Sequence, residues 1–287
     1  MPPFRLHPVL VLLLVALGVW HVWWVRDQPR AAVRRAAVGW LVLASVVLWP
    51  VGDLAASVSL SVATLQRLVI MLLVAPLLVM SVSTGHLVAL TRPEWVDVVT
   101  RRLAHPAVSM VVVTVVGTLT LSSPVVDAGA RSTLVRGVTL VAVLSCGVIL
   151  WIPALGVMPG AKRLSPVGRA GFIFVSSLVV TSLSLVWIFA RHSLYPGLRD
   201  QQALLHMTPL LDQQLAGFVA KLGSYIPMWA VAFTIFSRAE DAGIAVEETP
   251  LHWADVERQL LRVHRGESRA RRRAHHDGEG PLGRRVE

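Results

Sequence analysis

Six polar residues in otherwise apolar parts of the chain have side chains that could bind or orient another group. They are Gln66, Arg67, Asp212, Gln213, Gln214 and Lys221. Polar and ionisable side chains are costly inside a membrane, so such residues are usually paired or functional. Asp212 could form an ion pair with Arg67, and the amides could supply hydrogen bonds. Alternatively, the long stem of Arg67 could carry its charge to the membrane surface. For Lys221, which lies deeper in its apolar segment, a buried partner is the stronger expectation.

Small residues recur beside this polar group. Ala216, Ala220 and Ser224 follow one another at intervals of four residues, and Gly217 adjoins the first. Residues four apart share one face of a helix, and small side chains let two membrane helices approach closely. We therefore predict a helix-packing face here and not a reactive site.

A metal site has weaker support. His7, His192, His206 and Met207 are the candidate ligands, because imidazole and thioether groups suit copper. The three histidines come from distant segments, so a shared site is not the favoured interpretation. The chain has one cysteine, Cys146, which excludes a multi-cysteine metal motif. No phosphate-binding glycine loop, nucleophile elbow or HExxH motif occurs, so we expect no enzyme activity.

The segments that must position these residues are long and apolar. Hydrophobic residues make up 54% of the 287 residues and charged residues only 15%, whereas soluble chains carry about 25% charged residues. A helix needs about 20 mainly apolar residues to cross a membrane. Continuous apolar runs without alternation favour helices over a transmembrane barrel. We predict an all-α, polytopic membrane protein with seven transmembrane helices, at Leu6–Val25, Ala36–Val51, Val62–Ser83, Pro106–Ser123, Leu134–Gly156, Ala170–Ala190 and Asp212–Phe236.

The net charge of +10 is distributed unevenly along the chain. Of the 27 basic residues, 20 fall in the odd-numbered connections and in the C-terminal segment. Basic residues favour the cytoplasmic side, which predicts an outer N-terminus and a cytoplasmic C-terminus. Residues 1–237 would form the transmembrane domain, and residues 238–287 a basic tail that is largely disordered. Arg269, Arg271, Arg272 and Arg273 could bind anionic lipid headgroups, whereas the lack of interleaved aromatic residues argues against nucleic acid.

One segment resembles a known family. Residues 212–229 (DQQLAGFVAKLGSYIPMW) resemble the Asp-Gln-Gln-x-Ala-Gly signature of multi-span cytochrome c oxidase assembly factors of the CtaG type. Shorter segments agree with that family in order, at 69–81 (VIMLLVAPLLVMS), 146–156 (CGVILWIPALG), 164–169 (LSPVGR) and 194–196 (LYP). The resemblance implies a seven-helix protein of the bacterial plasma membrane that helps to mature a haem-copper oxidase. It further implies oxidase subunits as partners and copper delivery as a mechanism.

The chain departs from this family at two places. The family's His-Met-x-x-His-like motif is matched by residues 63–71 (ATLQRLVIM), which contain Arg67 and no histidine, and its Met-Trp pair is matched by Ala220-Lys221. Two cations there would repel copper. We therefore expect an oxidase assembly factor that lacks the usual copper ligands. The alternative is a transporter or channel for a small anion that uses Arg67 and Lys221.

Overall fold

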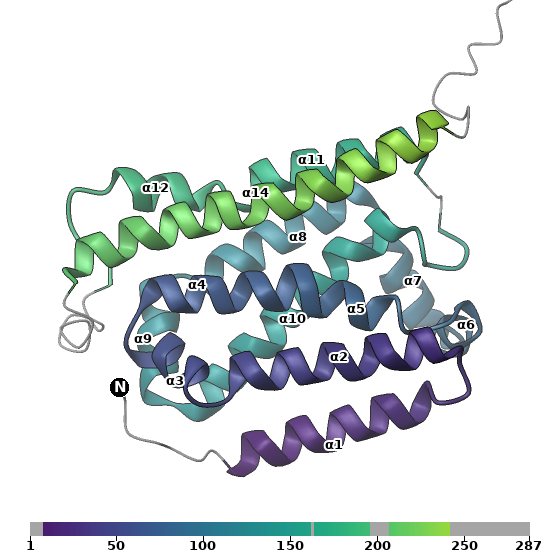
Figure 1. The fold of residues 1–287 in the computed structure, drawn as a ribbon, viewed down its shortest axis with the longest axis horizontal. Coiled ribbons are helices and arrows are strands. Elements are labelled where there is room, and N and C mark those ends of the chain that lie inside the picture. Colours follow the sequence, from purple (N-terminus) through teal and green to yellow (C-terminus); the bar gives the residue numbers. More distant parts are fainter. Residues whose placement is uncertain (1–7, 162–163, 196–206, 242–287) are drawn as a thin grey trace, which may run out of the picture. The chain divides into compact units, whose positions relative to one another are not determined.

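The computed structural model describes residues 8–161, 164–195 and 207–241, and every regular element in these ranges is a helix (Figure 1). The chain divides into a compact unit of residues 1–238 and a second unit of residues 239–287. Most of the second unit, including the four arginines expected to meet lipid headgroups, lies outside the described residues. The helices are α1 (Pro8–Trp24), α2 (Arg30–Val47), α3 (Val51–Ser57), α4 (Leu60–Val69), the π-helical turn η1 (Ile70–Val74), α5 (Ala75–Val79), α6 (Thr84–Leu90), α7 (Glu94–Leu103), α8 (Pro106–Leu119), α9 (Ser123–Arg131), α10 (Thr133–Leu155), α11 (Pro166–Val180), α12 (Leu183–Phe189) and α14 (Pro209–Asp241).

Three of the described helices are long and apolar enough to cross a membrane. They are the continuous run α4–η1–α5 (Leu60–Val79), α10, and α14. Two pairs qualify only as bent spans, α7 with α8 at 86° and α11 with α12 at 41°, which gives up to five spans. Helix α1 is apolar but shorter, and α2 begins with three arginines in its first two turns. The all-helical membrane architecture is thus confirmed, whereas the number of seven spans and the orientation of the termini stay predictions.

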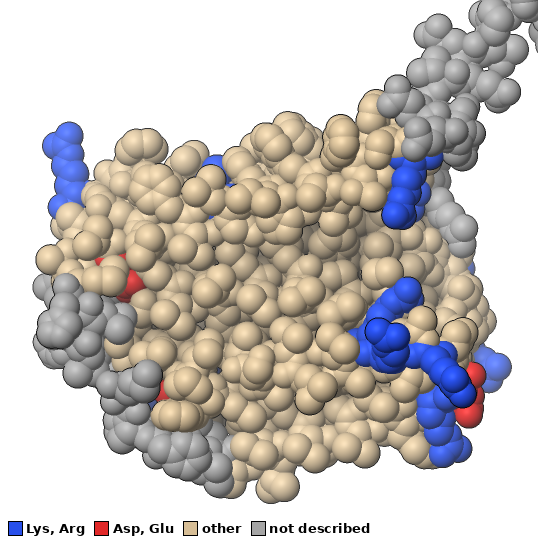
Figure 2. All heavy atoms as spheres, in the orientation of Figure 1, with Lys and Arg blue, Asp and Glu red and all other residues tan. Residues whose placement is uncertain are grey.

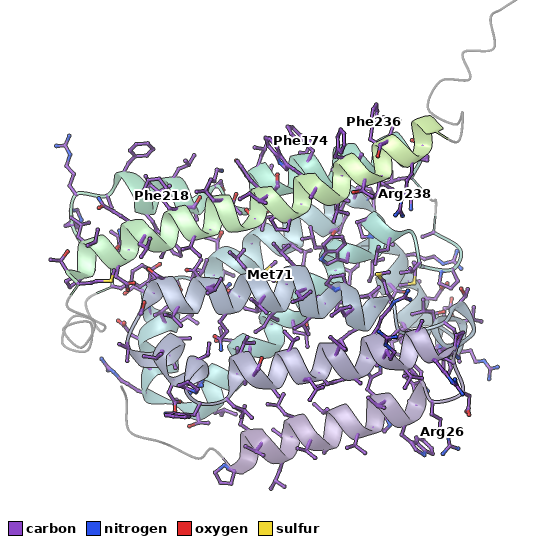
Figure 3. The ribbon with its side chains drawn as sticks, viewed as in Figure 1. Arg26, Met71, Phe174, Phe218, Phe236 and Arg238 are labelled. Atoms are coloured by element: carbon purple, nitrogen blue, oxygen red, sulfur yellow. The ribbon has the colours of Figure 1, made fainter. Side chains whose placement is uncertain are left out.

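Helix α10 lies at the centre of the first unit, against α8, η1, α5 and α11 (Figure 1). Its buried residues Val143, Leu150 and Trp151 join the main hydrophobic core with residues of α2, η1, α8 and α14. Other large apolar side chains point outward. Figure 3 shows Phe218 and Phe236 directed away from the helices around α14, and both are more than two-fifths exposed. Such a surface is costly in water but suits contact with lipid.

The π-helical turn leaves one backbone carbonyl without its usual partner. Ala75 N donates to Ile70 O, one residue further back than in an α-helix. Met71 O would therefore need the N–H of residue 76, which is a proline and has none. A backbone carbonyl without a partner costs several kcal/mol in a membrane, so a donor from elsewhere in the fold is required.

Helix α10 supplies that donor. Trp151 Nε1 donates to Met71 O at 2.9 Å. Gly147, about one turn before Trp151, lets the two helices meet. A Cβ at Gly147 would lie 2.7 Å from Ala75 Cβ and 2.9 Å from Met71 Cα. The segments 69–81 and 146–156 are therefore two halves of one helix contact.

Basic side chains gather at one end of the first unit. Figure 2 shows a group of Lys and Arg side chains at one end of the face drawn and an uncharged surface across its middle. Figure 3 places Arg26, just after α1, and Arg238, near the end of α14, toward that same end. This separation of charged end and apolar side is the pattern expected of a protein that lies across a bilayer.

Candidate functional site

Asp212 is a fully buried carboxylate in the first turn of α14, and it contacts the start of α4. Ser59 Oγ and Ser61 Oγ donate to its Oδ1 at 2.8 and 2.6 Å, and Ser61 N donates to the same oxygen at 3.2 Å. Leu60 N donates to Oδ2 at 2.7 Å. Ser61 and Asp212 are 151 residues apart in the sequence, so this shell joins two distant helices.

The start of α4 is suited to a carboxylate. The first N–H groups of a helix have no partner within it, and the helix dipole favours negative charge at this end. Ser59 is the N-cap, and its hydroxyl accepts from Val62 N at 3.3 Å. Asp212 satisfies the N–H groups of Leu60 and Ser61. Its charge is therefore stabilised by the helix that it holds in place.

Gln213 and Gln214 bind the segment that follows α12. Leu194 N donates to Gln213 Oε1 at 2.7 Å, and Gln214 Nε2 donates to Ala190 O at 3.2 Å. Tyr195, in the same segment, also contacts the chain just after α8, because its hydroxyl donates to Leu121 O at 2.6 Å. Burial raises the pKa of Tyr195 to about 12, so the hydroxyl stays a donor at neutral pH. The Asp-Gln-Gln sequence thus fixes α4 and the end of α12 to the start of α14.

The small residues of α14 lie where other helices come close. Ala216 is fully buried, and Ser224 is nearly so. A Cβ at Gly217 would lie 2.7 Å from Ile188 Cγ1 and 2.8 Å from Ser184 O, so α12 passes directly over it. Ala220 lines a cavity farther along α14.

Lys221 has neutral partners. Its Nζ lies 3.4 Å from Thr181 Oγ1 and 4.8 Å from the centre of the Tyr225 ring. A cation over an aromatic face is attracted by the ring electrons. Among the described residues, the partners of Lys221 are therefore the Thr181 hydroxyl and the Tyr225 ring, and neither is a carboxylate.

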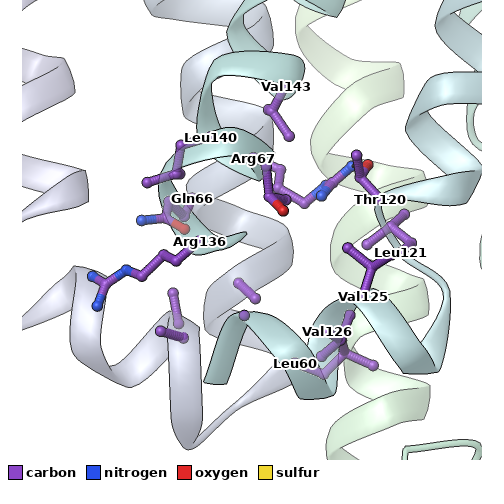
Figure 4. Close-up of a pocket in the computed structure, with 15 residues that line it drawn as sticks. Leu60, Gln66, Arg67, Thr120, Leu121, Val125, Val126, Arg136, Leu140 and Val143 are labelled. Carbon is purple, nitrogen blue, oxygen red and sulfur yellow. The ribbon is translucent and has the colours of Figure 1, made fainter. Parts of the chain in front are cut away.

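Gln66 and Arg67 lie two turns into α4. Gln66 Nε2 donates to Val46 O at 2.6 Å. Arg67 donates through Nη2 to Gly117 O at 3.2 Å and to Thr120 Oγ1 at 2.6 Å. Figure 4 shows the Arg67 side chain reaching toward Thr120. Arg67 belongs to α4, and Asp212 contacts the first residues of α4. The described partners of the two residues are nevertheless different.

Arg67 lines two cavities. The first, of about 80 Å³, lies between α3, α4, α9 and α10 (Figure 4). The second, of about 70 Å³, lies between α4, α8, α12 and α14. Most of the residues that line both cavities are apolar, and Arg67 is the one described charged residue that lines both of them.

A buried ion pair borders the first cavity. Arg136 Nη1 lies 2.8 Å from Asp53 Oδ1, with side-chain exposures of 11% and 8%, and Arg136 Nη2 donates to Val47 O at 3.1 Å. Arg136 lies in the first turn of α10, and its pairing with Asp53 was not predicted from the sequence. The available signal was that Asp53 and Arg136 each stand close to the end of an apolar segment.

The four candidate metal ligands do not form a described site. His192 is exposed, Met207 precedes α14, and His7 and His206 lie outside the described residues. Among the described residues, no group of three His, Cys, Asp or Glu side chains is placed to hold a metal ion. Where the resembled family has a histidine motif, Arg67 offers no lone pair to a metal, and its charge opposes a cation. The described residues therefore do not fit a copper ion.

The comparisons with known proteins bear on the whole helical unit. A family model described as "Cytochrome c oxidase caa3 assembly factor (Caa3_CtaG)" matches residues 13–240. That range takes in the Asp212 shell, the Trp151–Met71 contact and Arg67. No curated protein and no solved structure gives a significant match. Because the family model matches most of the length of this chain, the chain belongs to the family of cytochrome c oxidase caa3 assembly factors.

Proposed function

We propose that this chain is a non-enzymatic assembly factor for a cytochrome c oxidase, embedded as a multi-pass protein in a bacterial plasma membrane. The observation that carries the proposal is the family match over residues 13–240. The apolar helices and their outward-facing apolar side chains support the membrane location. The charge pattern supports a cytoplasmic position for the basic end.

The contacts of the polar residues support a scaffold in preference to a catalyst. Asp212, Gln213 and Gln214 hold α14 against α4 and α12. Trp151 holds α10 against η1. These groups are used in helix packing, so the surface left for an oxidase subunit is the apolar face of the bundle. A partner would dock there by helix packing within the membrane.

The chemistry of Arg67 supports assembly without copper transfer through this region. A cation in the matching position of the histidine motif disfavours a bound copper ion. The chain would therefore act on folding or association of oxidase subunits, and metal loading would be carried out by another protein. Metal analysis of the purified chain should accordingly give well under one copper per protein.

A deletion strain tests the assembly role. Loss of the gene should lower the haem absorbance of the cytochrome oxidase and the oxygen consumption that depends on it. The wild-type gene should restore both, and added copper salts should not. Normal oxidase spectra and respiration in the deletion strain would exclude the proposed role. Restoration by copper alone would show that the chain supplies metal after all.

Anion transport is the second candidate, and the two cavities beside Arg67 favour it. Its support is smaller, because Lys221 is not among the residues that line either cavity and has neutral partners of its own. The candidate predicts that vesicles containing the purified protein pass a small anion. Arg67→Ala and Lys221→Ala should each abolish that flux. Flux that persists in both variants would remove this candidate.

A further inference from the structure

Arg67 is a half-buried cation whose described partners are all neutral. A guanidinium has five N–H donors. The described hydrogen bonds of Arg67 use Nη2 alone, toward a backbone carbonyl and the Thr120 hydroxyl. Nε and Nη1 are therefore free to donate to a further group. Part of the side chain remains accessible even though it lies within the helix bundle, because it lines the two cavities.

Two carboxylates belong to helices that line the first cavity, and neither forms a described ion pair with Arg67. Asp53 pairs with Arg136. Asp127, on α9, accepts from Ser123 Oγ through Oδ2 at 3.4 Å, and its buried Oδ1 has no hydrogen-bond partner among the described residues. The described hydrogen bonds of Arg67 go to Gly117 O and Thr120 Oγ1, both neutral, and none of the described ion pairs includes Arg67. No described carboxylate therefore compensates the Arg67 charge.

Such a charge needs a counterion. Removing an ion from water costs several kcal/mol even after the protein relaxes, and neutral hydrogen bonds recover only part of that cost. Arg136, which lines the same cavity, has such a counterion, because it forms an ion pair with Asp53. In Figure 4, Arg136 points away from Arg67, so its carboxylate partner does not serve both.

The first cavity has the size and lining for a small counterion. A cavity needs about 10–15 Å³ of open space to hold one water molecule. The first cavity, at about 80 Å³, can therefore hold one small ion with its waters but no drug-sized ligand. Thr139 lines the cavity as well and carries a hydroxyl. The apolar remainder of the wall strengthens electrostatic attraction within it.

We propose that this cavity binds a small monovalent inorganic anion, of the size of chloride or nitrate, through Nε and Nη1 of Arg67. Thr120 holds the guanidinium in place for this purpose. The anion balances a charge that the described residues leave unbalanced. The site depends on neither proposed function, because it would hold the ion whether or not the chain assembles an oxidase or passes anions.

Equilibrium binding of radiolabelled chloride to the full-length protein in lipid nanodiscs tests this inference. Ionic strength is kept constant with gluconate, which is too large for the cavity. We expect one saturable chloride site per chain, and displacement by nitrate and bromide. The absence of saturable binding to the wild-type protein would overturn the proposal.

Three variants locate the site. Arg67→Gln should weaken binding by at least about tenfold, since it removes the charge-assisted hydrogen bonds. Arg131→Gln is the matched control and should bind as the wild type does, because Arg131 is exposed at the end of α9 and does not line the cavity. Ala63→Leu keeps Arg67 but fills space one turn before it in the same cavity, and should also weaken binding. Unchanged affinity in Arg67→Gln would overturn the proposal. If that variant cannot be purified, unchanged affinity in Ala63→Leu would do so.

Discussion

The carboxylate of Asp212 offers the sharpest test of how this fold is held together. Asp212→Asn keeps the shape of the side chain but removes its charge and turns one acceptor oxygen into a donor. Oδ1 accepts from Ser59 and Ser61, and Oδ2 accepts from Leu60 N. If the remaining oxygen stays with the two serines, the new amide faces the Leu60 N–H, donor against donor.

The expected cost follows from these contacts. A hydrogen bond to a charged group contributes about 1.5–3 kcal/mol. A negative charge at a helix N-terminus adds about 0.3–1 kcal/mol, and more where it is partly buried. Since the effects overlap, we expect Asp212→Asn to destabilise the protein by about 2–4 kcal/mol.

Thermal unfolding in a mild detergent, followed by tryptophan fluorescence, measures this effect, because the chain has 10 tryptophans. At this chain length, 1 kcal/mol corresponds to about 2–4 °C in Tm, so Tm should fall by about 4–16 °C. Asp27→Asn is the matched control. Asp27 is 84% exposed, and its ion-pair contact with Arg26 is long, at 3.8 Å. Its substitution should therefore change stability by less than about 0.5 kcal/mol.

A double-variant cycle separates the network from a general effect of the substitution. Ser61→Ala removes the hydroxyl that lies 2.6 Å from Asp212 Oδ1. Residues in one hydrogen-bond network couple by at least about 0.5 kcal/mol, so the double variant with Asp212→Asn should lose less than the two losses combined. Strict additivity, or a Tm for Asp212→Asn equal to that of the wild type, would refute the reasoning.

Three other substitutions test separate contacts. Trp151→Phe leaves Met71 O without its donor and should cost about 1–3 kcal/mol in thermal unfolding, whereas a cost near zero would mean that another group replaces the indole. Gly217→Val places a side chain against Ile188 and should cost about 1–3 kcal/mol by overpacking, with unchanged stability showing that α12 can move aside. Tyr195→Phe should cost about 0.5–1.5 kcal/mol at neutral pH. Because burial raises the pKa of Tyr195 to about 12, from about 10 in the unfolded chain, the wild type should also lose stability as pH rises from about 10 to about 12. The Phe variant should lose less over that range, and equal losses in the two proteins would contradict the assignment.

Long apolar runs made the principal helices predictable. The runs at 62–83, 134–156 and 212–236 coincide closely with α4–α5, α10 and α14, because a continuous apolar stretch has one stable form in a membrane. The short helices α3, α6, α7 and α9 were not predicted. Their residues are mixed in polarity and few in number, so their helical state depends on the packing around them. The 86° bend between α7 and α8 is equally a product of tertiary structure.

The sequence selected the polar residues of the candidate site, but it did not predict how they pair. Asp212, Gln213 and Gln214 are buried or partly buried contacts, yet Asp212 takes its donors from Ser59 and Ser61 at the start of α4. A serine just before an apolar helical run is a recognisable N-cap signal. It could have indicated a helix N-terminus, which favours a nearby carboxylate. The buried pair of Arg136 with Asp53 was not predicted, because the sequence does not show that the start of α10 lies beside α3.

The contact between Trp151 and the Met71 carbonyl has a consequence for how the chain is made. Residues 60–79 are synthesised and reach the membrane well before residues 133–155. During that interval the carbonyl released by the π-helical turn has no indole to accept from. A nascent chain cut before residue 133 must leave this group to water or to the insertion machinery, or form a different helix there. The π-helical turn of the early span therefore obtains its hydrogen-bond donor only from the later span, and membrane entry alone does not complete it.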